Sequence, residues 1–381
     1  MTTGAGMRRR QPLVTAAMIV CNEAANLGAC LESLHEVVDE VVVVDTGSSD
    51  ASVDIARSFG AHVYSESWQN DFSKARNAAL DRATGDWILY IDADERLRPA
   101  RRVDVVALLE HAEEVAFRIV LRPFVGATPC REYRLWRNDP RIRFEGIIHE
   151  KVTPSIEAVA RADGRGIGLC ELALDHLGYE GDQLRKHRRN LPLLRAQLAA
   201  EPGNVFNLCH LASVLDALGD RSGADDALDR ALQLVRQRTS GEGPPGGQFV
   251  YADLARRHHD DGNLDGARRT LAEGCAVYPR DPLLLWQQAV TALDGGDPSA
   301  ALRWLDRLEA TDRRALDDVL SYDERLFGVF LHQGRGLALF RLGRFSAARE
   351  SYLAAEKCEP GNVELRTKRL LAERLAAGGT T

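Results

Sequence analysis

The two halves of the chain differ in how hydrophobic and polar residues alternate. In the first half, short apolar runs are separated by segments in which apolar residues recur every three or four positions. This alternation predicts strands at 13–21, 37–44, 61–65 and 87–91, and helices at 24–35, 50–58 and 73–83. Strands that alternate with helices of this length are typical of β-α-β units, so we expect an α/β domain with a doubly wound sheet.

Between residues 98 and 181 the pattern is less regular. It predicts a helix at 103–110 and strands at 115–121, 133–137 and 143–148, the last two on either side of the turn Asn138-Asp139-Pro140. These elements would complete a first domain that we expect to span residues 13–182.

The second half shows a helical pattern from Gln183 onward. Four glycines are each followed by an alanine five positions later: Gly219, Gly262, Gly296 and Gly343 precede Ala224, Ala267, Ala301 and Ala348. A glycine that ends one helix, followed by a small residue that lets the next helix pack closely, is typical of tetratricopeptide-like helix pairs. We therefore expect an all-α repeat domain at 183–381, with insertions near 239–247 and 311–327 and a closing helix at 363–376.

The strand at 87–91 ends abruptly in acids, Asp92-Ala93-Asp94-Glu95. Asp92 and Asp94 are two residues apart, so in extended backbone their carboxylates share a face. Two carboxylates this close repel each other unless a cation lies between them, which predicts a divalent-metal site at the carboxyl end of the strand. The alternative for an isolated Asp-x-Asp is a solvated acidic turn.

Two other predicted strands end in polar residues that should lie at the same edge of the sheet. Asn22-Glu23 follows the first strand, and Asp45-Thr46-Gly47-Ser48 follows the second. Arg76 lies near the start of a helix, where its guanidinium could bind a phosphate or hold one of the aspartates. Each residue also has a structural alternative: Asn22 as a helix N-cap, Asp45 as a turn former and Arg76 on a solvated helix face. Their convergence at one edge favours a ligand site.

Four segments resemble a known family in their order and spacing. VCNEAANL, VVVVDTGSSD, FSKARNAAL and GDWILYIDADE are similar to the family 2 glycosyltransferases of the GT-A fold, over about residues 13–100. The resemblance implies an inverting transfer of a sugar from a nucleotide diphosphate donor. It further implies Mn²⁺ or Mg²⁺ as cofactor and a UDP-sugar as the donor.

The same resemblance assigns residues to the donor site, namely Asn22, Glu23, Asp45, Thr46, Arg76, Asp92, Ala93 and Asp94. Within this set, Arg76 would face the diphosphate, while Asp92 and Asp94 would serve ribose, metal and diphosphate. Many relatives carry a second acid where Thr46 stands, so the contact to the base departs from the family pattern.

The acceptor side is indicated by two later segments, 134–137 and 144–150. They resemble a bacterial branch in which such a transferase is fused to tetratricopeptide-like repeats and which includes peptide S- and O-glycosyltransferases. An acceptor hydroxyl or thiol needs a base, for which Glu150 and Glu145 are the candidates. His149 and His176 are candidate metal or phosphate ligands, with a surface pair as the alternative. Trp136 fits either a sugar-stacking platform or the core.

Composition narrows the range of functions. A net charge of −7, with 45% hydrophobic and 28% charged residues, is that of a globular protein and argues against nucleic-acid binding. No run approaches the roughly 18 apolar residues of a membrane span, and residues 1–12 predict a disordered tail. The seven cysteines are scattered without a CxxC pair, which favours a reduced, cytoplasmic protein without disulfides or zinc sites.

The partner of the repeat domain stays open at this point. Helical repeats form concave surfaces, so they could bind an acceptor, form a homodimer or brace the first domain. Peptides, small natural products and envelope glycans are the acceptor classes that fit. The second hypothesis for the whole chain is a catalytically inactive transferase-like domain whose repeats recruit a protein partner.

Overall fold

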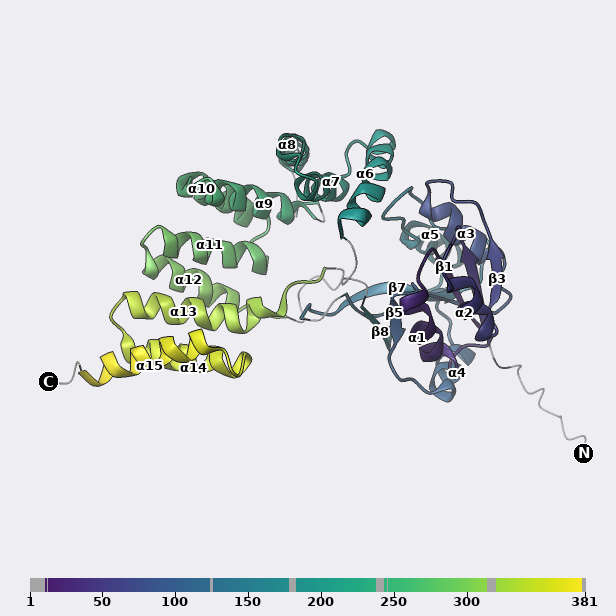
Figure 1. Ribbon diagram of the computed structural model, residues 1–381, viewed down its shortest axis with the longest axis horizontal. Coiled ribbons are helices and arrows are strands. Elements are labelled where there is room, and N and C mark those ends of the chain that lie inside the picture. The colour runs from purple at the N-terminus through teal and green to yellow at the C-terminus, as the bar shows by residue number, and fades with distance from the viewer. Residues whose placement is uncertain are drawn as a thin grey trace, which may run out of the picture. The chain divides into compact units, whose positions relative to one another are not determined.

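The computed structural model describes residues 11, 13–123, 126–177, 183–237, 243–244, 246–313 and 320–378. They form two compact units, and each is described by itself (Figure 1). The first holds the residues up to 125 with 129–186 and 192–197, and the second holds 126–128, 187–191 and 198–381. The predicted tail at 1–12 lies outside the described residues apart from Gln11, and the domain boundary after residue 182 stays a prediction.

The first unit is built on an eight-stranded mixed sheet in the described part of the chain, with the order β3-β2-β1-β4-β7-β6-β8-β5. Its strands are β1 (Val14–Val20), β2 (Glu40–Asp45), β3 (His62–Ser65), β4 (Trp87–Tyr90), β5 (Glu95–Leu97), β6 (Ala116–Arg122), β7 (Cys130–Arg137) and β8 (Ile167–His176). The first four are parallel, as the sequence pattern predicts. β7 then runs antiparallel to β4, which makes the whole sheet mixed.

Helices cover both faces of this sheet. They are α1 (Ala24–Leu34), α2 (Ser52–Ser58), α3 (Phe72–Leu80), α4 (Arg102–Glu110) and α5 (Thr153–Asp163). Alternate residues of β1 face opposite sides: Met18 packs with residues of α1, α2 and α4, whereas Ala17 packs with residues of α3 and α5. The result is a three-layer α/β domain with two cores (Figure 1).

The predicted strand at 143–148 is wrong. In the structure this segment is a loop whose backbone groups bond to side chains of neighbouring helices. Asn77 of α3 exchanges two hydrogen bonds with the backbone of Phe144, and Ser73 donates to the carbonyl of Gly146. Gln197 accepts from the N–H of Ile147. These partners and a single β-bridge between Glu145 and Lys151 take up backbone groups of the segment, which does not extend into a strand of the sheet. β5, α5 and β8 were not predicted.

The second unit consists of helices that pack in antiparallel pairs, as predicted (Figure 1). α6 (Gln183–Ala200) contributes residues to both units. The other helices are α7 (Val205–Ala217), α8 (Arg221–Gln237), α9 (Gly247–Asp260), α10 (Leu264–Val277), α11 (Pro282–Asp294), α12 (Pro298–Glu309), α13 (Val329–Arg341), α14 (Phe345–Cys358) and α15 (Val363–Gly378), with a 3-10 turn at Glu324–Phe327. The insertions near 239–247 and 311–327 lie partly outside the described residues.

The glycine and alanine positions explain the pairing of these helices. All four glycines have positive φ, from 72° at Gly343 to 85° at Gly219, which glycine adopts without strain. All four alanines are fully buried where the second helix of each pair meets the first. The sequence pattern is therefore confirmed by the backbone conformation and by the packing.

Candidate active site

The candidate site lies at the carboxyl edge of the parallel strands. Val20 of β1 pairs with Asp45 of β2, and Ala17 pairs with Tyr90 of β4. The loops that follow these three strands therefore leave the sheet at one edge, where open α/β sheets bind ligands.

The loops after β1 and β2 are tied to each other. Asn22 has φ 58°, and its side-chain oxygen accepts hydrogen bonds from the N–H groups of Ser49 (2.7 Å) and Asp50 (3.2 Å). The N–H of Asn22 donates to Ser48 Oγ at 2.9 Å. Asn22 is thus not the N-cap of α1, a position that Glu23 holds without a side-chain bond. A strained left-handed residue held by this many bonds is a feature often found at functional sites.

Asp45 and Thr46 also have structural partners. The buried Asp45 carboxylate accepts from the N–H groups of Gly47 (3.2 Å) and Ser48 (3.1 Å) and so closes its own turn. Thr46 bonds the carbonyl of Val20 through its N–H and its hydroxyl. These residues fix the shape of the edge, and their contact with a nucleoside stays a prediction.

Arg76 joins two of the predicted site residues. Its Nη1 lies 2.8 Å from Asp92 Oδ1, and its Nε donates to Glu150. The side chains of Arg76 and Glu150 are 10% and 9% exposed. Of the two roles that the sequence left open for Arg76, the structure shows the one in which it holds an aspartate. Burial works against the charge of Arg76, but Asp92 outweighs it and raises the pKa of the guanidinium.

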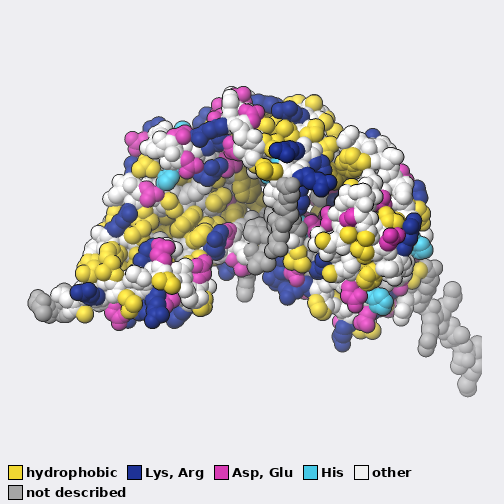
Figure 2. All heavy atoms as spheres, viewed as in Figure 1, with side chains coloured by type: hydrophobic (Ala, Val, Ile, Leu, Met, Phe, Trp, Pro, Cys, Tyr) yellow, Lys and Arg dark blue, Asp and Glu magenta, His cyan; other side chains and the backbone are white. Residues whose placement is uncertain are grey.

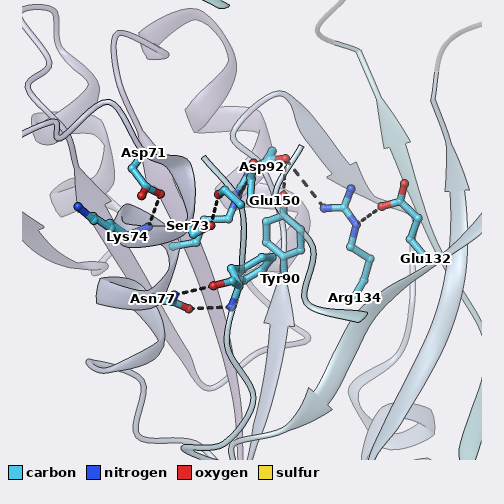
Figure 3. A network of polar contacts seen from close by, with 12 residues as sticks. Asp71, Ser73, Lys74, Asn77, Tyr90, Asp92, Glu132, Arg134 and Glu150 are labelled. Atoms are coloured by element: carbon cyan, nitrogen blue, oxygen red, sulfur yellow. Dashed lines mark hydrogen bonds and ion pairs between the residues drawn. The ribbon is translucent and has the colours of Figure 1, made fainter. Parts of the chain in front are cut away.

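Tyr90 is the centre of this network (Figure 3). Its hydroxyl donates to Asp92 Oδ2 at 3.0 Å, and the guanidinium groups of Arg76 and Arg134 lie 4.4 Å and 4.3 Å from its ring centre. Cations over an aromatic face are attracted by its negative electrostatic potential. Burial would raise the pKa of Asp92, but the two arginines and the tyrosine hold it below its usual range.

Asp94 and His176 meet beside this network. The carboxylate of Asp94 lies 3.2 Å from His176 Nε2, and both side chains are partly exposed. The contact arises because β5 pairs with β8 and places Glu95 opposite His176. The hydrogen bond to Asp94 raises the pKa of the imidazole.

This pair supplies a carboxylate and an imidazole, which suit a divalent cation that takes further ligands from phosphates and water. Among the described residues, no group of three or more His, Cys, Asp or Glu side chains could hold a metal ion. A cation here would therefore rest on Asp94 and His176, while Asp92 is held by Arg76.

Sequence reasoning gave no role to Glu95 or Arg134, which form a buried ion pair. Arg134 donates to both carboxylate oxygens of Glu95, at 2.9 Å and 3.1 Å, and to Glu132 at 3.0 Å. Burial raises the pKa of Glu95 to about 7, although Arg134 opposes this. The available signal was an arginine between Tyr133 and Leu135 in a predicted strand, because a charge that a strand buries needs a buried partner.

Three other predicted residues lie differently. Glu145 is exposed and lines a cavity of about 370 Å³ with residues of α5, so the structure does not bring it to Asp92. His149 precedes Glu150 in a left-handed backbone conformation, with φ 55°. Trp136 is 1% exposed and packs against Tyr90 and Phe144, so the core alternative holds.

Comparisons with known proteins identify a family for part of this chain. The model of the Glycosyl transferase family 2 matches residues 15–154. A TPR repeat-containing protein of Synechococcus elongatus is 34% identical over 70% of this chain and 66% of its own length. The SPbeta prophage-derived glycosyltransferase SunS of Bacillus subtilis is 28% identical over 59% of this chain and 54% of its own length. This chain thus spans between half and about two thirds of these relatives.

Solved structures resemble the chain more loosely. Staphylococcus aureus TarS, residues 1–349, is 15% identical over 69% of this chain and 91% of that structure, with a TM-score of 0.38. Mannosyl-3-phosphoglycerate synthase of Rubrobacter xylanophilus is 20% identical over 50% of this chain and 75% of that structure, with a TM-score of 0.39.

Two further findings bear on the sequence predictions. The structure has all seven cysteines free. Among the described residues, no helix combines the length and apolar character that a membrane span requires. Residues 15–154 belong to the family 2 glycosyltransferases, and the helix pairs that follow them are tetratricopeptide-like repeats.

Proposed function

We propose that this chain is a metal-dependent, inverting glycosyltransferase that moves a sugar from a UDP-sugar to a hydroxyl or thiol of an acceptor. The observation that carries the proposal is the Asp94–His176 pair beside the Arg76–Asp92–Glu150 network, at the carboxyl edge of the family 2 domain. A single basic and acidic cluster there provides both a cation site and a carboxylate for proton transfer.

The donor side of the reaction requires stabilisation of a leaving diphosphate. A divalent cation, when bound by Asp94 and His176, supplies this stabilisation as negative charge develops. Arg76 and Tyr90 hold the Asp92 carboxylate in one orientation, with two hydrogen bonds of 2.8 Å and 3.0 Å. Asp92 therefore orients the donor in this proposal.

The acceptor side requires a base, and Glu150 is the residue that we propose. The Arg76 guanidinium bonds the carboxylates of both Glu150 and Asp92, so these two carboxylates are bridged by a single side chain. Glu150 would accept the proton of the attacking hydroxyl or thiol. Peptides, small natural products and envelope glycans all present such groups. A lipopolysaccharide core biosynthesis glycosyltransferase, LpsC of Rhizobium meliloti, is 34% identical over 37% of this chain and 58% of its own length, which supports the glycan class.

The test is release of nucleotide diphosphate from a panel of nucleotide sugars, with Mn²⁺ or with EDTA. Asp94→Ala should lower the rate at least about 100-fold, because it removes a ligand of the cation. Asp104→Ala is the matched control, since Asp104 is an exposed aspartate that pairs with Arg101 on α4.

The proposal is contradicted if the wild-type protein turns over no donor, or if Asp94→Ala keeps full metal-dependent turnover. Wild-type protein that binds no nucleotide sugar would instead favour the alternative of an inactive interaction module.

A further inference from the structure

We propose that Glu95 is a positioning residue that fixes the Asp92-Ala93-Asp94 loop in the orientation needed for donor and cation. This inference rests on the proposed function and adds a residue to it. Glu95 is 1% exposed, so its carboxylate cannot contact a substrate and must act through its neighbours. Its Oε2 accepts the N–H of Asp92 at 2.8 Å.

Glu95 and Asp92 bond each other in both directions. The N–H of Glu95 donates to the carbonyl of Asp92 at 3.0 Å, while the Glu95 side chain accepts from the N–H of Asp92. The Glu95 side chain reaches back to the N–H three residues earlier, as the last residue of a capping box does, and so closes the turn. It leaves the side chains of Asp92 and Asp94 to point to their own partners, Arg76 and His176.

The rest of the loop is anchored from three elements. Cys30 of α1 donates to the Asp92 carbonyl at 3.4 Å, and Arg96 donates to the Ala93 carbonyl at 3.1 Å. The N–H of Leu177 donates to the Asp94 carbonyl at 2.9 Å. Glu95 adds the anchor for the Asp92 N–H, at the residue that Arg76 and Tyr90 also hold.

Arg134 of β7 holds the Glu95 carboxylate in place through two hydrogen bonds. Buried ion pairs are costly to desolvate, and apolar residues of similar volume are often at least as stabilising. Stability alone therefore does not explain why a glutamate occupies this position. A role in fixing the loop does, because an apolar residue offers no acceptor to the Asp92 N–H.

Three substitutions separate this role from a merely structural one. Glu95→Gln keeps an acceptor for the Asp92 N–H, and Glu95→Met keeps the volume but removes the acceptor. Glu132→Gln is the control, because Glu132 also pairs with Arg134 but does not touch the loop. If Glu95→Met fails to fold because Arg134 has lost its buried partner, the double variant Glu95→Met/Arg134→Met, which removes both buried charges, is measured in its place.

Two measurements apply to each folded variant. The first is amide hydrogen exchange of residues 92–95 in metal-free protein, which needs no activity. The second is the Mn²⁺ concentration for half-maximal donor turnover, together with kcat and donor KM. We expect Glu95→Met to exchange at least about tenfold faster and to need at least about tenfold more Mn²⁺. Glu95→Gln should lie between Glu95→Met and wild type, and Glu132→Gln should match wild type.

Three results would overturn the inference. A folded Glu95→Met or double variant with wild-type exchange and wild-type Mn²⁺ dependence removes the role of Glu95 while the proposed function stands. The same holds if Glu132→Gln changes both measurements as much as Glu95→Met. Wild-type protein without donor turnover overturns the proposed function and this inference with it.

Discussion

Charged side chains are used differently in the two units of this molecule. The sheet unit buries one group of them at a single edge, where Arg76, Glu95, Arg134 and Glu150 have side chains that are at most 10% exposed, in addition to exposed pairs such as Arg101–Asp104. In the repeat unit, most ion pairs lie on the outside, such as Arg221–Asp261 and Arg236–Glu273. Figure 2 shows basic and acidic side chains intermingled over the visible surface of the repeat helices.

The difference indicates that the buried charges at the sheet edge serve the chemistry of the site, whereas the exposed charges of the repeat unit serve solubility. An exposed pair contributes about 0–1 kcal/mol, because water screens it and two long side chains lose freedom. A buried pair is costly to form, yet removing one partner destabilises by about 3–5 kcal/mol, because the other charge is left unpaired in a poor solvent for ions. The buried cluster at the sheet edge is therefore a place where orientation matters more than stability.

The largest effect should follow from Arg76→Met. The variant leaves Asp92 and Glu150 without their shared cation, so we expect the sheet unit to lose about 3–5 kcal/mol of unfolding free energy and donor turnover to disappear. Urea unfolding, with amide exchange of β4 to assign the transition, measures the stability. Arg221→Met makes the same change at an exposed pair and should cost about 1 kcal/mol or less. Equal losses of unfolding free energy in the two variants would contradict the difference between buried and exposed ion pairs.

The sequence could predict the features of the two units that depend on local patterns, namely the positions of helices and strands. The apolar patterns placed β1 to β4 and α1 to α4 within a few residues, because a continuous apolar run marks a strand that is buried on both faces and a spacing of three or four residues marks one buried face of a helix. The glycine and alanine spacing placed the helix pairs for the same reason.

What the sequence could not predict depends on partners far apart in the chain. Glu95 and Arg134 are 39 residues apart in the chain. They meet because Arg134 lies on β7, which runs beside β4, and the short loop after β4 leads to Glu95. The loop at 143–148 looks like a strand, but side chains of α3 and Gln197 take its backbone groups. Asn22 was placed in a polar loop correctly, yet the bond of its side chain to Ser49 requires the packing of two loops. Tertiary contacts of this kind leave no periodic signal.

A smaller effect should come from filling the contact between paired helices in the repeat unit. Ala267 of α10 is fully buried, so Ala267→Leu must push neighbouring helices apart and should cost about 1–3 kcal/mol. Ala272 lies on the exposed side of the same helix, and Ala272→Leu should stay within about 0.5 kcal/mol of wild type. Urea unfolding of both variants, with amide exchange of α10, checks this. Equal stabilities would mean that the repeat pattern does not reflect close packing.

The smallest effect tests whether a buried charge in the repeat unit is also costly. Asp281 caps α11, accepts from the N–H of Leu284 (2.9 Å) and the hydroxyl of Tyr322 (2.7 Å), and is 8% exposed. Burial raises the pKa of its carboxyl group above the usual value. A raised pKa in the folded state means that the contribution of this group to stability is present at low pH and is lost as pH rises through that pKa.

Asp281→Asn keeps an oxygen acceptor for the cap but cannot ionise. Its stability relative to wild type should therefore increase from pH 4 to pH 7, because the buried wild-type carboxyl group ionises over this range at a cost that the amide does not have. Asp297, the exposed cap of α12, bonds the N–H of Ala300 at 2.8 Å, and Asp297→Asn is the matched control at an exposed cap. Thermal unfolding at the two pH values measures both variants. A relative stability of Asp281→Asn that falls toward pH 7 would show that the buried carboxylate is well compensated, which would make the cost of buried charge specific to the sheet unit.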